Sequence, residues 1–250
     1  MHQRPRGPQT IAVDGIVDVV PIVSTCAVLL AVSVAANATV NSVRRALEDR
    51  YHHARTLKAA FFERYSDGNG GIAAESGTVY FSRPGRMRWD YESPQQKMFL
   101  VDGTNAWFYV PADRTASRAK MKESSDWRTP LALLAGKADL SEMCRKLDLV
   151  EPGNPSAKDE KPLAADDALL RCVPRDNPTG PEGNVPYVLL EVDPEARLVR
   201  VVIRDVGNAE TEFRFGNWEE NLAIPEIKFH FQPPPGVAIV DEGSLANAIR

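Results

Sequence analysis

The sequence contains few of the side chains that carry out enzyme chemistry. Its 250 residues include three cysteines and four histidines. No Ser-His-Asp order, metal-ligand spacing or glycine-rich phosphate loop stands out along the chain. His52 and His53 are neighbours on a predicted helix, so their side chains point about 100° apart and cannot bind one metal ion together. We therefore expect no catalytic site, no metal site and no cofactor.

An excess of positive charge is also missing. The formal net charge is −4 and the pI is about 5.7, so the chain as a whole does not attract polyanions, and we expect no nucleic-acid binding. One segment departs from this balance. Residues 81–94, FSRPGRMRWDYESP, place three arginines among three large apolar side chains: Arg83, Arg86, Arg88, Met87, Trp89 and Tyr91. A catalytic site, a nucleic-acid groove or the wall of a lipid pocket could each use such a segment.

The first 38 residues have the pattern of an export signal. A stretch with two arginines comes before an apolar run over 19–36, and Ala36-Asn37-Ala38 offers the small residues that signal peptidase requires. Residues 1–38 are thus a predicted signal peptide, and residues 39–250, beginning at Thr39, are the mature domain. Asp14 and Asp18 are irregular in such a signal. A translation start downstream of Met1 and an uncleaved membrane anchor are therefore alternatives.

Export would leave two thiols in the mature chain, Cys144 and Cys172. An even number of cysteines in an oxidising compartment favours a disulfide. The two residues also lie at similar distances from the centre of a predicted loop between two strands. We predict a Cys144–Cys172 disulfide, with two buried free thiols as the alternative.

The mature chain is predicted to begin with one helix and to continue mainly in strands. Apolar residues recur every three or four positions from Val40 to Leu57, and Thr39 or Asn41 can cap the start of this helix. Alternating or near-continuous apolar runs then predict strands over 57–65, 77–82, 87–92, 97–101 and 105–110, with turn sequences between them.

A short apolar helix and a second set of strands are expected further along. Thr129 and Pro130 can start a helix that ends at Gly136, and its leucines cover more than one face, so it must be buried or must cover something apolar. Asp139 can start another short helix, to about Cys144. Strands are predicted over 145–151, 167–173, 187–193, 198–205, 211–218 and 226–232. The predicted fold class is mainly β (α+β), a single curved antiparallel sheet or open barrel with a helical cover.

Four motifs, in this order and spacing, resemble the outer-membrane lipoprotein carrier protein family, the periplasmic chaperones of bacterial lipoprotein sorting. They are an Arg-Pro motif with a tryptophan, an Asp-Gly motif with two aromatics, a Thr-Pro motif with leucines, and a closing Phe-x-Phe motif: Arg83, Pro84, Trp89; Asp102, Gly103, Trp107, Tyr109; Thr129, Pro130, Leu131, Leu133, Leu134; Phe229, Phe231, Gly236, Val237. The resemblance covers most of the mature chain apart from the loops over 151–186.

The resemblance implies an incomplete antiparallel β-barrel with a helical lid over an apolar cavity. It also implies a periplasmic monomer that takes triacylated lipoproteins from an inner-membrane lipoprotein-releasing ABC transporter and delivers them to an outer-membrane lipoprotein receptor. Arg83 occupies the position of the family's arginine that holds the empty lid shut. The predicted cavity lining is Phe61, Met87, Trp89, Tyr91, Phe99, Trp107, Tyr109, Leu131, Leu133 and Leu134; an aromatic is usual at the position of Met87.

Strand alternation gives the arginine-rich segment two distinct faces. One face carries its apolar side chains, including Trp89, and the other carries Arg86 and Arg88, which we expect to be solvated. Pro84 lacks a backbone donor and is expected near a sheet edge.

Three other functions compete with the carrier function. The first is an outer-membrane receptor of similar fold, which needs a lipidated cysteine at its mature start. The others are a periplasmic lipoprotein-sensing regulatory domain and a hydrolase, for which no acid/base pair stands out.

Overall fold

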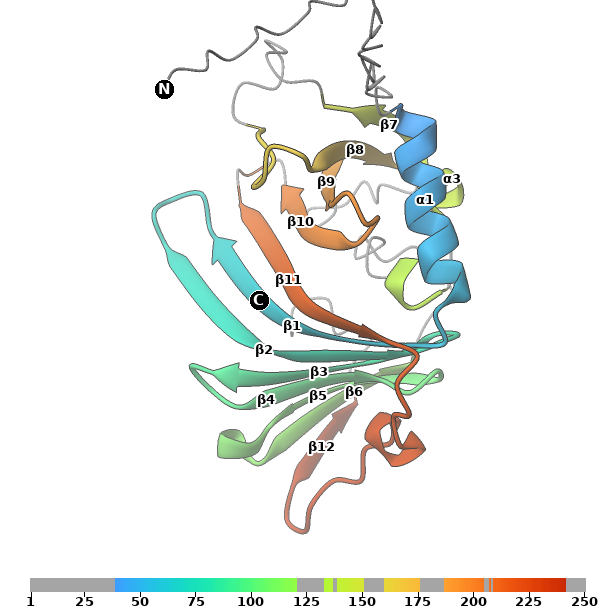
Figure 1. Ribbon diagram of the computed structural model, residues 1–250. Coiled ribbons are helices and arrows are strands. Elements are labelled where there is room, and N and C mark those ends of the chain that lie inside the picture. The colour runs from blue at the N-terminus through green and yellow to red at the C-terminus, as the bar shows by residue number, and fades with distance from the viewer. Residues whose placement is uncertain are drawn as a thin grey trace, which may run out of the picture. The chain divides into compact units, whose positions relative to one another are not determined.

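The computed structural model describes residues 39–120, 133–136, 139–150, 160–175, 187–204, 207 and 209–241, all of which lie in the unit spanning Asn37–Arg250 (Figure 1). The predicted signal peptide, residues 1–38, lies outside this part. The helices and strands are α1 (Val40–His53), β1 (Thr56–Ser66), β2 (Ile72–Ser82), β3 (Arg86–Ser93), β4 (Lys97–Val101), β5 (Asn105–Val110), η1 (Pro111–Asp113), β6 (Thr115–Lys120), α3 (Leu140–Met143), β7 (Cys144–Leu149), β8 (Ala168–Pro174), β9 (Tyr187–Val192), β10 (Leu198–Arg204), β11 (Glu210–Glu220), η3 (Glu226–Phe229) and β12 (Ala238–Asp241).

The described strands form one open sheet. Its order is β12-β6-β5-β4-β3-β2-β1-β11-β10-β9-β8-β7, and within the described residues the end strands β12 and β7 do not pair with each other. Neighbouring strands are antiparallel except β12, which pairs in parallel with β6. Figure 1 shows the sheet strongly bent, with β1–β6 and β8–β10 on either side of one interior that α1 borders. The predicted mainly β, incompletely closed architecture is confirmed.

The first helix begins where its capping residue predicts. The Thr39 side chain accepts a hydrogen bond from the Ser42 N–H (3.2 Å), and the Ser42 hydroxyl accepts one from the Thr39 N–H (2.9 Å). The helix ends at His53, because Ala54 is already extended. Leu57 therefore lies in β1, and the prediction that the helical pattern runs on to Leu57 is wrong. The apolar side chain of Leu57 is nevertheless buried in the interior cluster, because the inward face of β1 packs in the same cluster as α1.

The sheet is covered on both faces where its central strands run. Met98, Phe99, Leu100 and Val101 of β4 are all buried, as the continuous apolar run predicts. The buried side chains fall into separate clusters. The interior cluster includes residues of α1, β1–β4, β8–β11 and the segment 133–144, while a smaller cluster on the opposite face includes Leu100, Trp107 and Phe229.

The closing segment does not form the predicted strand over 226–232. Residues Glu226–Phe229 form the 3₁₀ helix η3, and Phe229 and Phe231 pack onto the outer face of the sheet instead of joining its edge. The arginines of β3 hold this segment. Arg86 pairs with Glu226 (2.7 Å), and Arg88 donates to the Lys228 carbonyl (3.1 Å). Arg86 and Arg88 thus anchor a neighbouring segment and are half-buried, so the expectation that both are solvated is wrong.

The predicted position of Pro84 is also wrong. Residues 83–85 form the turn between β2 and β3, which are central strands of the sheet and not its edge. A turn leaves the proline nitrogen without a partner on a neighbouring strand, just as a sheet edge does. The absence of a backbone N–H at Pro84 therefore could not show which of these two positions the residue occupies. Among the described residues, no helix is both long enough and apolar enough to cross a membrane.

Candidate functional site: an aromatic interior wall under a lid

Aromatic side chains from distant parts of the chain line the interior face of the sheet. Trp89 lies at the centre, with ring centroids at 4.7 Å from Phe61, 5.4 Å from Phe213 and 6.0 Å from Phe215. Strand register explains the meeting, since Phe61 on β1 pairs directly with Phe215 on β11. All four side chains are almost fully buried. The result is an apolar wall made of β1, β3 and β11.

The predicted lining residues Phe61, Trp89, Tyr91 and Phe99 share this interior cluster, and Met87 packs against it. The wall also contains a polar contact, in which the Tyr91 hydroxyl donates to the carboxylate of Glu63 (2.9 Å), whose side chain is buried. The sequence analysis missed Glu63, Phe213 and Phe215. The alternation of 211–218 marked the two phenylalanines as inward, but only the non-local pairing of β11 with β1 brings them to this wall.

A short lid segment, residues 133–136, covers the wall. Leu133 and Leu134 have no exposed surface and belong to the same interior cluster. The helical turn ends at Gly136, whose φ of +69° suits glycine and few other residues. Leu131, Thr129 and Pro130 lie outside the described residues. The leucines that the structure describes thus pack where the resemblance placed the lid.

The β2–β3 turn holds the lid segment through few contacts. The Gly85 N–H donates to the Ala135 carbonyl (2.8 Å). The guanidinium of Arg83 lies close against Gly136: a methyl group on Gly136 would come within 2.1 Å of Arg83 Nε. Arg83 Nη1 donates to the Ala54 carbonyl (3.4 Å), at the end of α1. Arg83 therefore touches both the lid and the helix beside it.

The electrostatics of Arg83 are unusual for a half-buried cation. It makes no ion pair within the described residues, and its Nε has no hydrogen-bond acceptor there. Burial lowers the pKa of its guanidinium, and the charge of Asp139 opposes that shift. The described contacts of the Arg83 guanidinium are thus with the Ala54 carbonyl and with Gly136.

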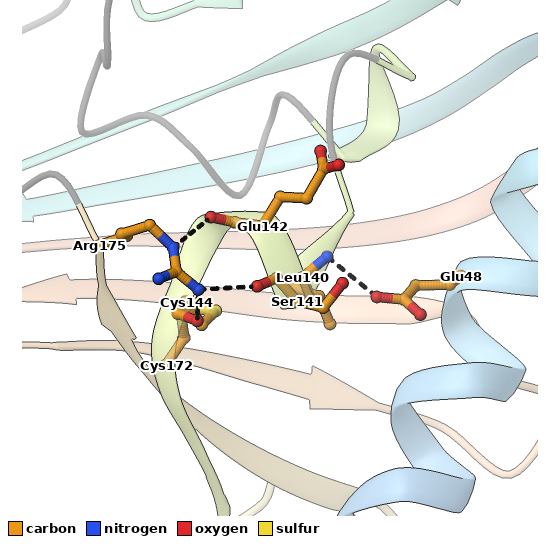
Figure 2. The surroundings of a disulfide bond; sticks show 7 residues. All are labelled: Glu48, Leu140, Ser141, Glu142, Cys144, Cys172 and Arg175. Carbon is orange, nitrogen blue, oxygen red and sulfur yellow. Dashed lines mark hydrogen bonds between the residues drawn. A yellow bond between two sulfur atoms is a disulfide. The ribbon is translucent and has the colours of Figure 1, made fainter.

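The chain that follows the lid is held far more firmly. The Leu140 N–H at the start of α3 donates to Glu48 of α1 (3.0 Å). At the other end, Arg175 donates to three carbonyls of α3, those of Ser141 (3.1 Å), Glu142 (3.0 Å) and, through its backbone N–H, Met143 (2.8 Å). Figure 2 shows Arg175, Glu48 and the adjoining disulfide around this one turn of helix. These contacts, together with the adjoining disulfide, hold α3 in place beside the lid segment.

The Cys144–Cys172 disulfide is present, with a Cα–Cα distance of 5.4 Å. The predicted pairing about the loop centre is confirmed as well, because Cys144 lies opposite Pro174 on β8. A register shift between Cys144 and Lys146 brings the sulfur atoms of Cys144 and Cys172 together. The bond joins β7, which directly follows α3, to β8.

The grouping of Trp107 and Tyr109 with the interior aromatics is wrong. Both lie on the outer face, where Phe231 packs against them with ring centroids 5.4 Å and 5.1 Å away. The Trp107 indole N–H donates to Asp102 (3.1 Å). Residues 105–110 are apolar almost throughout, so their sequence did not reveal which face is inward. Ala106 belongs to the interior cluster and Phe108 packs against it, so these two residues face inward.

Comparisons with known proteins agree with this architecture. Residues 52–151 match the family described as outer membrane lipoprotein carrier protein LolA. The chain is 28% identical to the outer-membrane lipoprotein carrier protein of Nitrosospira multiformis, over 78% of this chain and 87% of the relative. It is also 28% identical to the protein of that name from Nitrosomonas europaea, over 88% of this chain and 95% of the relative. Residues 52–151 thus match the lipoprotein carrier family model, and the chain is similar over most of its length to proteins named outer-membrane lipoprotein carrier protein.

Two solved structures also align with most of this chain, at lower sequence identity. One is a LolA superfamily protein from Nitrosomonas europaea, with a TM-score of 0.40 and 10% identity, covering 78% of this chain and 98% of that protein. The other is an uncharacterized conserved protein from Thermus thermophilus, with a TM-score of 0.48 and 10% identity, covering 81% of this chain and 98% of that protein.

Proposed function

We propose that this protein carries lipoproteins by enclosing their acyl chains between its aromatic wall and its lid. One observation carries the proposal: Leu133 and Leu134 are fully buried against the interior cluster, on the aromatic wall where acyl chains would lie. Acyl chains could replace these leucines on the wall without unfolding the sheet. The similarity of this chain to outer-membrane lipoprotein carrier proteins supports the same function.

The energetics favour a lid that closes when the carrier is empty. Burying each methylene group contributes about 0.8 kcal/mol, so several acyl chains in a permanently open pocket would bind almost irreversibly. A lid that packs its own leucines on the wall must be displaced first, and this displacement lowers the apparent affinity. Arg83 and Gly136 add a contact that is present only in the closed arrangement. Closure therefore helps the carrier to release its cargo.

The remaining parts of the proposal concern place and partners. Residues 1–38 direct export to the periplasm and are removed, so that the mature protein begins at Thr39. An inner-membrane lipoprotein-releasing ABC transporter loads the carrier, and an outer-membrane lipoprotein receptor unloads it. The carrier acts as a monomer and as a binding protein, not as an enzyme.

Native mass spectrometry of protein purified from the periplasm tests this function. We expect a fraction of the protein to retain lipoprotein or acyl lipid, and we expect purified carrier to move a lipoprotein from one membrane preparation to receptor-bearing membranes. Protein that is always empty and that moves no lipoprotein would contradict the proposal.

A further inference from the structure

The indole N–H of Trp89 is buried without a hydrogen-bond acceptor in the part of the chain that the structure describes. The side chain is 2% exposed. Its surroundings are aromatic rings, those of Phe61, Phe213, Phe215 and Phe81, at centroid distances from 4.7 to 6.4 Å. A buried donor without a partner loses its hydration and receives nothing in return, so such groups are rare in folded proteins.

The two other described tryptophans differ in this respect. Trp107 donates to Asp102 (3.1 Å) on the outer face, and Trp218 donates to the Leu198 carbonyl (3.0 Å). Their N–H groups serve the fold itself. Trp89 lies on the wall that we assign to cargo, and there its donor serves no contact among the described residues of the closed structure.

We propose that the Trp89 indole N–H donates a hydrogen bond to an acyl carbonyl of the bound cargo, and that it selects acylated ligands over plain hydrocarbon. This inference rests on the proposed carrier function and names one determinant of its specificity. A lipoprotein anchor carries ester and amide carbonyls at the heads of its acyl chains, whereas an alkyl chain has no acceptor. In an apolar interior, a hydrogen bond that satisfies an otherwise orphaned donor discriminates strongly between ligands.

An isosteric replacement separates the N–H from the shape of the ring. Substituting Trp89 with 3-benzothienylalanine keeps the bicyclic ring but replaces the N–H with sulfur. We expect the empty protein to melt at a higher temperature, because the unsatisfied donor is gone, while affinity for a synthetic triacylated lipopeptide falls about three- to tenfold. A purely structural role of Trp89 would not move the two quantities in opposite directions. Trp89→Phe provides a second, simpler variant.

Trp107 supplies the matched control. The same replacement there removes a donor that bonds to Asp102, so the melting temperature should fall and lipopeptide affinity should stay unchanged. The indole N–H resonance in a ¹⁵N spectrum adds a direct readout: the Trp89 signal, assigned through Trp89→Phe, should move on lipopeptide binding, and the Trp218 signal should not.

The ligand series identifies the acceptor. One lipopeptide has its two ester-linked chains replaced by ether-linked chains, and another lacks the amide-linked chain. Wild-type protein should bind one of them several-fold more weakly than the parent, and the benzothienyl variant should lose that preference. Equal binding of all three by the wild-type protein, or an unchanged preference in the variant, overturns the Trp89 assignment and leaves the carrier function intact. Failure of the wild-type protein to bind any lipopeptide contradicts both.

Discussion

Arg83 is a half-buried cation. Among the described residues, its guanidinium contacts the Ala54 carbonyl and Gly136, and it forms no ion pair. Its role as a latch is a prediction from the resemblance, and the geometry agrees with that role. The guanidinium touches the lid at Gly136 and the end of α1 at Ala54. A leucine could fill much of the same space but could not donate to the Ala54 carbonyl.

We predict that Arg83→Leu impairs hand-over more than it impairs folding. The melting temperature should change little, because the substitution also removes a partly desolvated charge. Transfer of a lipoprotein to receptor-bearing membranes should fall clearly, because the empty lid no longer closes with the same preference. Arg118→Leu is the control, since Arg118 pairs with Asp241 (2.7 Å) far along the sheet. Wild-type hand-over by Arg83→Leu would remove the latch assignment.

Asp167 is a second residue with an unusual charge state. Burial and a hydrogen bond with the fully buried Glu191 raise the pKa of the Asp167 carboxyl to about 6. The pKa in the folded state lies above that of the unfolded chain, so the folded state binds this proton more tightly. The stabilisation is complete below the unfolded pKa and is lost as pH rises towards about 6.

Asp167→Asn should therefore stabilise the protein at neutral pH. The amide can donate to Glu191 at every pH, whereas the wild-type carboxylate opposes Glu191 once it ionises. We expect the variant to gain a few degrees in melting temperature relative to wild type at about pH 7.5, and clearly less at about pH 5. An Asp167→Asn effect that is equal at both pH values contradicts the assignment.

At the scale of the element, the lid and its base differ in how they are attached. Residues 133–136 are held by the β2–β3 turn, and α3 is held by Glu48, Arg175 and the disulfide. Opening is therefore expected between Gly136 and Asp139, so that Leu133 and Leu134 move while Leu140 stays in the core.

Gly136→Ala should shift the lid towards its open arrangement. The added methyl group would strain a positive φ and would collide with the Arg83 guanidinium. Binding of an apolar dye such as bis-ANS should increase several-fold, because the lid is closed in a smaller fraction of the protein and the dye has to displace it less often. Gly70→Ala is the matched control: its φ is +103° but no atom lies within 4 Å of the new methyl group. That variant should lose stability without binding more dye, and equal dye binding by the two variants would contradict the lid assignment.

Local chemistry explains which elements the sequence could predict. Thr39 starts α1 as expected, because its cap bond joins residues only three positions apart. Asp139 also lies at the start of α3, but its side chain makes no cap bond there, and Glu48 of α1 accepts from the Leu140 N–H instead. The sequence did not predict which face of the sheet Trp107 occupies, or that residues 226–232 do not form a strand. Both depend on partners far along the chain, and a continuous apolar run does not distinguish one face of a strand from the other. The lid contact at Gly136 also required the three-dimensional structure, since the sequence marks Gly136 only as a helix end.

At the scale of the whole molecule, the predicted mature start, Thr39, is also the residue that caps the first helix. Thr39 caps α1 through both its side chain and its backbone N–H. A free α-amino group at Thr39 could still donate to Ser42. Cleavage after Ala38 would thus preserve the capping box.

We predict that the protein purified from the periplasm begins at Thr39. Intact-mass measurement together with N-terminal sequencing would establish this directly. Ala38→Leu should block processing, because signal peptidase requires a small residue before the cleaved bond. A mature protein that begins elsewhere would contradict the prediction, and persistence of residues 1–38 in the wild-type protein would favour the membrane-anchor alternative.

The outer-face cluster has a consequence for a protein that must give up part of its interior. Leu100, Trp107, Phe229 and Phe231 keep β4 and β5 packed on the side away from the lid, and Arg86 and Arg88 tie the closing segment to β3. Under the proposed function, the interior cluster exchanges its own leucines for acyl chains while the outer-face cluster keeps its contacts. The sheet is then expected to remain folded through each exchange.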